Sequence, residues 1–149
     1  MNMAWVYRFV FSLLLLGCCR GPAHAQDMNL VVIGNSKGVP ADLKLVQLKS
    51  TMKGEKLRWP DGSKVVIALL KSTTPIGQNT SKKIYNMSAN ELNKYWLALV
   101  FQGKADAPNF FNSEAELEEF VAQTTGAIGV VNQPATGNKT ITVDGKRFL

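Results

Sequence analysis

The stretch from Met87 to Val131 constrains the fold most, because it contains two consecutive amphipathic helix patterns and a closing apolar segment. Ser88 followed by Glu91 predicts a capping box at the start of the first helix, and Gly103 predicts its end. Apolar residues recur between these signals at the spacing of one helical face, at Leu92, Tyr95, Trp96, Leu99 and Val100.

The second helix pattern runs from Ser113 to Gly126 and follows the same plan. Ser113 with Glu116 predicts the start of this helix, and Gly126 predicts its end. Its apolar residues are Leu117, Phe120 and Val121. The short apolar run Ala127–Val131 that follows predicts a buried strand.

Residues 1–25 predict a cleavable signal peptide. Arg8 gives the positive start, Phe9–Cys19 forms an apolar core, and Ala23–Ala25 supplies the small-x-small cleavage pattern. The apolar core is shorter than the about 20 residues that a membrane-spanning helix needs. No later segment is long and apolar enough to cross a bilayer, so we expect a periplasmic or secreted protein cleaved after Ala25.

Cys18 offers an alternative to simple cleavage. Leu15–Cys18 loosely resembles a bacterial lipoprotein signal, in which Cys18 would carry a lipid. Leu16 is a poor match to the small residue preferred in such a signal, and the site at Ala25 is cleaner. We therefore favour plain secretion and keep lipidation as the minor alternative.

Cleavage after Ala25 would remove both cysteines and the single histidine, His24. Cys and His nucleophiles, histidine acid–base chemistry and the usual zinc ligand sets are then excluded, so we expect neither an enzyme nor a metal site. Of 17 Lys and Arg residues, two lie in the first 25, which leaves 15 against 11 Asp and Glu, a formal charge of +4. These cations are scattered, and the dense basic stripe of a nucleic-acid-binding protein is missing.

Two further strands are predicted at Met28–Ile33 and Lys64–Leu70, with a helix from Pro40 to Met52 between them. This order predicts a parallel βαβ unit. A weak helix is expected from Ile76 to Tyr85, and an edge strand at Thr140–Val143. The fold class is therefore α/β, with residues 26–149 forming one small domain in which helices cover a mixed, mostly parallel sheet in three layers.

The ordered set of segments resembles the small phosphate ABC transporter substrate-binding-protein-like family, which is related to the type 2 periplasmic binding proteins. The matching segments are Val31–Asn35, Gly54, Trp59–Gly62, Met87–Ser88, Tyr95–Trp96, Phe101–Gly103, Pro108 and Thr125–Val130. The resemblance covers about residues 30–131, and it implies one lobe of a binding protein without a cofactor. The larger relatives close two lobes around the anion, whereas this chain is long enough for one.

The resemblance also implies an oxyanion site, with phosphate as the first candidate. The larger phosphate-binding proteins hold the anion on a Ser-Gly-Thr-type turn, and the corresponding segment here is Ser72–Gly77. It keeps the hydroxyls but has no glycine between them, and Pro75 lacks an N–H donor. The ligand-binding residues expected are Ser72, Thr73, Thr74 and Gly77, with Asn35 and Ser36 on a neighbouring loop. Lys71 could add positive charge.

Each of these features also has a purely structural interpretation. A hydroxyl at Ser72 or Thr73 could simply cap the next helix, and Asn35 could belong to an ordinary turn. The acidic residues of the second helix are interpreted as a solvated face; they are Glu114, Glu116, Glu118 and Glu119. The alternative function is an envelope or transporter-associated interaction protein that keeps the fold without binding a ligand.

Overall fold

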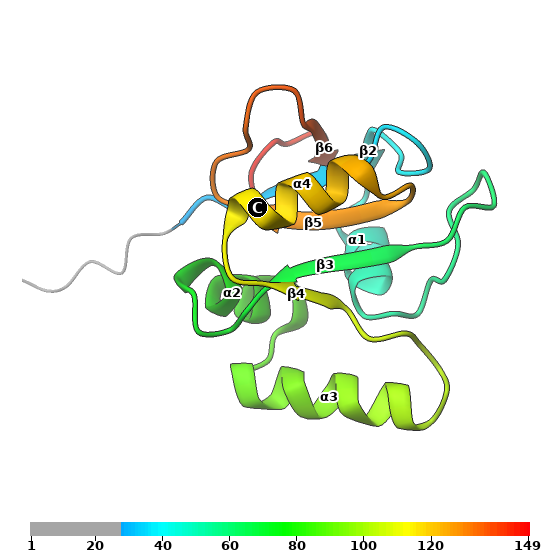
Figure 1. The fold of residues 1–149 in the computed structure, drawn as a ribbon, viewed down its shortest axis with the longest axis vertical. Coiled ribbons are helices and arrows are strands. Elements are labelled where there is room, and N and C mark those ends of the chain that lie inside the picture. Colours follow the sequence, from blue (N-terminus) through cyan, green and yellow to red (C-terminus); the bar gives the residue numbers. More distant parts are fainter. Residues whose placement is uncertain (1–27) are drawn as a thin grey trace, which may run out of the picture.

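The computed structural model describes residues 28–149, and in this part of the chain six strands form one mixed sheet (Figure 1). The strands are β1 (Val31–Gly34), β2 (Asp42–Leu43), β3 (Val66–Leu70), β4 (Asn109–Phe111), β5 (Ala127–Val131) and β6 (Lys139–Val143). The helices are α1 (Leu45–Met52), α2 (Pro75–Thr80), the π-helical turn η1 (Ser81–Tyr85), α3 (Ala89–Phe101) and α4 (Glu114–Gln123). The predicted signal peptide lies outside the described residues.

The strand order is β2-β6-β1-β5-β3-β4, with β5 between β1 and β3. β5 is antiparallel to β1 and parallel to β3, so β1 and β3 run in opposite directions. The predicted parallel βαβ unit is therefore wrong, because a strand from late in the sequence separates the two strands that were expected to pair. The β3–β4 and β2–β6 pairs are parallel and β1–β6 is antiparallel, so the predicted mixed, mostly parallel sheet is confirmed.

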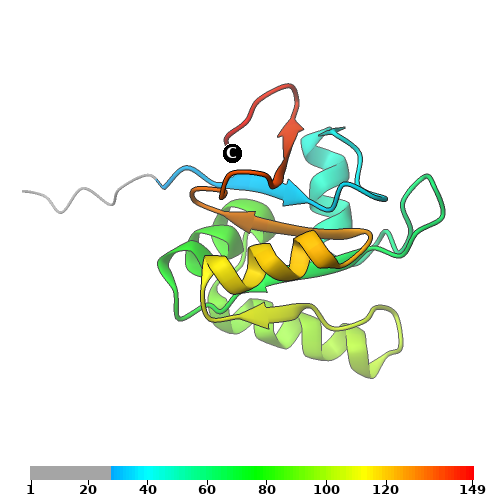
Figure 2. The same ribbon diagram turned by 45° about the horizontal axis from the view of Figure 1, so that its top comes forward.

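Helices cover both faces of the sheet, as the α/β class requires. α4 lies along one face, against β5 and β3, whereas α1, α2 and η1 lie on the other (Figures 1 and 2). α3 contacts η1 and lies beyond the edge strand β4, at the bottom of the view in Figure 1. No helix in residues 28–149 is long and apolar enough to span a membrane.

Burial on both faces explains why β1 and β5 are continuous apolar runs. All residues of these two strands are buried, and they form the middle of the core together with β3. On the second side, Tyr85 and Trp96 pack edge to face at 6.5 Å between ring centres. Tyr85 Oη donates a hydrogen bond to the carbonyl of Met52 (2.7 Å), and burial raises the pKa of this phenol.

The two strongest helix predictions are confirmed, since α3 and α4 begin directly after Ser88 and Ser113. In the α3 capping box, Glu91 N–H donates to Ser88 Oγ, and Ser88 N–H donates to the Glu91 carboxylate. The bond from Ser88 N–H lowers the pKa of this carboxyl group. Trp96 is buried in the core as predicted. Trp59 is also buried, and its Nε1 donates to the carbonyl of Gly126 (2.8 Å).

The helix predicted from Pro40 begins only at Leu45, because Asp42 and Leu43 form β2 instead. The Asp42 carboxylate accepts a hydrogen bond from the Thr142 hydroxyl (2.5 Å), and β2 pairs in parallel with the end of β6. The predicted strand at residues 140–143 is confirmed as β6, although β2 covers the end of its outer edge.

Gly126 is the glycine on which the sheet depends most. Its φ is +75°, and a Cβ atom there would lie 2.1 Å from the carbonyl oxygen of Lys64. We expect Gly126→Ala to lower the free energy of unfolding by more than the about 1–2 kcal/mol of a left-handed alanine alone. Gly62 is the matched control, because its φ is +87° but nothing lies within 4 Å of the added Cβ. Equal losses in denaturant titrations of the two variants would contradict this close-approach argument.

Candidate functional site

The segment Ser72–Gly77 leaves the sheet at the carboxyl ends of two parallel strands. β3 ends at Leu70 beside the end of β4 at Phe111, and Lys71 N–H donates to the carbonyl of Phe111 (2.9 Å). Each strand then turns into a helix, β3 into α2 and β4 into α4. Parallel strands therefore bring two helix N-termini to the same edge of the sheet, which is where α/β proteins commonly bind ligands.

The Thr74 hydroxyl is used inside the protein. Thr74 Oγ1 accepts a hydrogen bond from Gly77 N–H (3.0 Å) and donates one to the carbonyl of Lys71 (2.8 Å). Thr74 is therefore the N-cap of α2, with Pro75 in the first helical position. The helix cap that was considered for Ser72 or Thr73 is therefore Thr74. Thr74 was also expected to donate a hydrogen bond to the anion.

Gly77 is required by the turn itself. A Cβ atom at this position would lie 2.2 Å from the carbonyl oxygen of Lys71 and 2.8 Å from that of Leu70. The close approach that glycine permits here is therefore between α2 and the end of β3. Gly77 was expected to be a ligand-binding residue, and that role stays a prediction.

Ser72 and Thr73 are the predicted donors that remain available. Within residues 28–149, neither hydroxyl forms a hydrogen bond; Ser72 is half-buried and Thr73 is exposed. The Lys71 side chain beside them is exposed. This turn thus presents two free hydroxyls and one cation at the edge of the sheet, directly before α2.

Asn35 and Ser36 lie at the other end of the sheet. Asn35 N–H donates to the carbonyl of Ala127 (2.8 Å), and Ala127 pairs with Val66 at the start of β3. Ser72 follows the end of β3, so the length of that strand separates the two loops. The structure does not bring the six predicted ligand-binding residues together.

The buried Asn35 side chain links β1 to α4. Its Nδ2 donates to the carbonyls of Val121 (2.8 Å) and Ala122 (2.9 Å), and its Oδ1 accepts from Lys37 N–H (2.8 Å). The bond from Lys37 N–H is the local turn contact that the structural interpretation of Asn35 expected. The two bonds from Nδ2 satisfy carbonyls in the last turn of α4, which the sequence did not indicate.

The acidic face of α4 was predicted to be solvated. This holds for Glu116 and Glu119, which are exposed, whereas Glu114 is half-buried and the prediction is wrong for Glu118, which is buried. Glu114 accepts hydrogen bonds from the backbone N–H groups of Asn132 (2.7 Å) and Gln133 (3.3 Å), just after β5. Glu116 accepts from Asn112 N–H (3.1 Å), just before α4. Two carboxylates of α4 itself, those of Glu114 and Glu116, therefore lie in its first turn, where the positive end of the helix dipole favours negative charge.

Glu118 extends the same pattern along α4. It is buried, and its carboxylate accepts from Ala135 N–H (2.9 Å) and from Asn138 Nδ2 (2.7 Å). Glu114 and Glu118 together hold the loop between β5 and β6. The sequence spacing of these acids gave no signal for this role, because the partners lie 17 to 20 residues further along the chain.

The described residues form an α/β fold, a mixed six-stranded sheet with helices on both faces, and hydroxyl groups lie at the carboxyl end of β3. Among solved structures, the chain is similar to phosphate ABC transporter substrate-binding proteins, as its sequence pattern indicated. No family model and no curated protein matches the sequence.

Three of these structures give the extent of the similarity. An ABC-type phosphate transport receptor from Vibrio cholerae has a TM-score of 0.60 at 16% identity, covering 81% of this chain and 48% of that one. A protein from Clostridium perfringens, described as a phosphate ABC transporter substrate-binding protein with bound phosphate, has a TM-score of 0.60 at 16% identity, covering 79% and 46%. PstS from Borrelia burgdorferi has a TM-score of 0.59 at 15% identity, covering 79% and 48%.

The similarity shows a shared fold, since the identity is low. The chain spans about half the length of each protein it matches. These neighbours are transport receptors and binding proteins, which is the class of activity expected from the sequence.

The different environments of Thr74 and Thr73 can be tested by substitution. We expect Thr74→Ala to lower the free energy of unfolding by about 1 kcal/mol, because it removes the N-cap of α2. Thr73→Ala should change it by less than about 0.5 kcal/mol, since that hydroxyl is exposed and unbonded. Urea titration followed by circular dichroism measures both, and the reverse order of effects would contradict the capping assignment.

Proposed function

We propose that this chain is a secreted, non-enzymatic solute-binding module, which binds phosphate or a similar oxyanion at the turn formed by Lys71, Ser72 and Thr73. The observation that carries the proposal is the pair of unbonded hydroxyls at the carboxyl end of β3. The shared fold supports it, because one of the similar structures is described as containing bound phosphate.

The chemistry of the turn suits an oxyanion. The Ser72 and Thr73 hydroxyls can each donate one hydrogen bond to an anion oxygen, and Lys71 can balance part of its charge. The start of α2 adds the positive end of the backbone dipoles, although Pro75 contributes no N–H group. Thr74 and Gly77 support this site by fixing the shape of the turn, and they need not contact the ligand.

The proposed site is open to solvent, because Lys71 and Thr73 are exposed. An anion bound on an open edge keeps part of its hydration, so its hydrogen bonds are weaker than in an enclosed site. We therefore expect weak, salt-dependent binding by this chain alone.

Phosphate titration followed by thermal unfolding tests this proposal. A ligand that binds only the folded state adds about 2.7 kcal/mol of stability at 100 times its dissociation constant. We expect a rise in melting temperature with phosphate that exceeds the rise with chloride at equal ionic strength. The Ser72→Ala/Thr73→Ala double variant should lose this rise while remaining folded.

Ser36→Ala is the matched control, because Ser36 is an exposed serine at the opposite end of β3. Its response to phosphate should equal that of the unsubstituted protein. If phosphate still raises the melting temperature of the double variant, the anion binds elsewhere on the protein. If phosphate does not raise the melting temperature of the unsubstituted protein, the proposal is wrong.

The second candidate function is an interaction module of the cell envelope, and the outer surface of α3 favours it. Leu97, Val100 and Phe101 are exposed on this helix, Phe101 at 90%. α3 lies at the bottom of the view in Figure 1, beyond the edge strand β4. Exposed apolar groups of this kind, gathered on one helix, are typical of protein-contact surfaces.

Binding of a partner protein to this surface of α3 should depend on Phe101. We expect Phe101→Ser to abolish co-purification of a stable stoichiometric partner, because the apolar contact is lost. Phe148→Ser is the control, since Phe148 is also an exposed phenylalanine but lies near the end of the described chain. Equal effects of the two substitutions, or a chain that co-purifies with nothing, would count against this function.

A further inference from the structure

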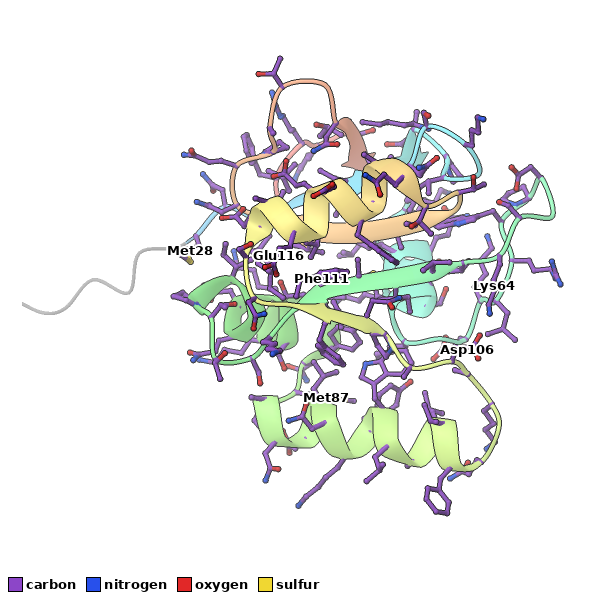
Figure 3. All side chains as sticks on the ribbon, in the orientation of Figure 1. Met28, Lys64, Met87, Asp106, Phe111 and Glu116 are labelled. Carbon is purple, nitrogen blue, oxygen red and sulfur yellow. The ribbon has the colours of Figure 1, made fainter. Side chains whose placement is uncertain are left out.

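A groove of about 560 Å³ lies at the opposite end of β3 from the Ser72 turn. Three segments line it: residues 54–58 after α1, the start of β3 at residues 64–67, and residues 100–109 between α3 and β4. Figure 3 shows this separation, with Lys64 and Asp106 on one side of the molecule and Phe111 and Glu116 on the other. The groove is therefore distinct from the proposed oxyanion site.

The groove is strongly cationic. Four cations line it, Lys56, Arg58, Lys64 and Lys104. Among the described residues Asp106 is its only acidic lining residue, which gives a formal charge of +3. Lys64 and Asp106 form an exposed ion pair, with Nζ and Oδ2 2.5 Å apart. The other three cations have no acidic partner in the part of the chain that the structure describes.

Two of those cations are held in place by neutral groups. Lys56 Nζ lies 5.9 Å from the centre of the Trp59 ring, and Arg58 Nη1 donates to the carbonyl of Gly62 (2.9 Å). A cation over a ring or bonded to a carbonyl keeps its full charge. These contacts thus limit the motion of the positive groups without neutralising them, and Lys104 remains exposed and unpaired.

The rest of the lining is mainly apolar. Val65 and Ile67 are buried on its β3 side, whereas Leu57 is 54% exposed and Val100 is 42% exposed. Small side chains at Ala105 and Ala107 keep this part of the groove open. A groove that combines apolar side chains with three unpaired cations is suited to a ligand that has an apolar body and a negative charge.

We propose that this groove binds a small organic anion, with one carboxylate facing Lys104, Lys56 and Arg58 and an apolar body against Leu57 and Val100. The volume lies within the about 300–1,000 Å³ of small-molecule sites. An inorganic oxyanion would leave the apolar surface in water, and a neutral apolar ligand would gain nothing from the cations. Both parts of the ligand are therefore needed to match the groove.

Titration with three probes tests both parts, using backbone amide NMR spectra of the purified protein. Hydrocinnamate has a carboxylate and an apolar body, hydrocinnamyl alcohol has only the body, and acetate has only the charge. We expect hydrocinnamate to shift signals from residues 56–58, 64–67 and 103–107, with an affinity at least about tenfold above either partial probe. Equal affinities, or shifts that map to other residues, would overturn the proposal.

Two charge substitutions should move the hydrocinnamate affinity in opposite directions. Lys104→Glu should lower it about tenfold, because an unpaired cation becomes an anion beside the carboxylate. Asp106→Asn should raise it, because it removes the acidic lining residue and frees Lys64 from its ion pair. Lys82→Glu is the control, since Lys82 is an exposed lysine on η1 outside the groove lining.

The full pattern distinguishes this site from a general effect of charge. An equal loss in Lys104→Glu and Lys82→Glu would show attraction by net charge alone and would overturn the proposal, as would an Asp106→Asn variant that binds no better. Phosphate added during the titration should leave the groove signals unchanged, because the proposed oxyanion site lies at the other end of β3.

Discussion

Backbone pairing of β5 with β1 on one side and β3 on the other joins the first and second halves of the chain. β5 is buried along its whole length, so all of its hydrogen-bonding groups must be satisfied by these two neighbours. Gly126, the residue directly before β5, has both of its backbone groups in hydrogen bonds to other segments. Gly126 N–H donates to Lys37, while its carbonyl accepts from both Trp59 Nε1 and Val66 N–H. The turn after β1, the turn before β3 and the start of β5 therefore depend on one residue.

The position of β5 also determines where functional groups can gather. Because β1 is antiparallel to β3, the loop after β1 lies beside the start of β3, and the loop after β3 lies at the other end. One end of β3 thus carries Asn35 and the cationic groove, and the other carries the Ser72 turn and the start of α4. The same pairing therefore separates two chemically different surfaces.

Local signals in the sequence were sufficient for the helices and for most of the strands. Ser88 with Glu91 and Ser113 with Glu116 fixed the starts of α3 and α4, because a capping interaction involves residues only three apart. Strand partners depend on long-range contacts, which explains why β1 and β3 were wrongly paired. Asp42 and Leu43 were assigned to a helix for the same reason, since their strand partners are 100 residues further along the chain.

At the candidate site, too, features that depend on neighbouring residues could be predicted, and features that depend on strand pairing could not. The cap of α2 was expected at Ser72 or Thr73 and lies at Thr74, because the cap position depends on where the helix begins, which is at Pro75. Ser72 and Thr73 were proposed as donors from their hydroxyl groups and from the resemblance. The separation of Asn35 from Ser72 could not be read from the sequence, because it follows from the direction of β1. The groove combines cations from three separate segments, and no local pattern joins Lys56 to Lys104.

The carboxylate of Glu114 competes with dissolved anions for two backbone N–H groups at the end of β5. It is covalently tethered next to the N–H groups of Asn132 and Gln133, so its effective concentration there is orders of magnitude above that of a dilute solute. A free anion present at micromolar levels could not displace it. These two donors are in effect permanently occupied by the protein, and any selectivity for a dissolved anion at this edge must come from groups that no tethered acid can reach.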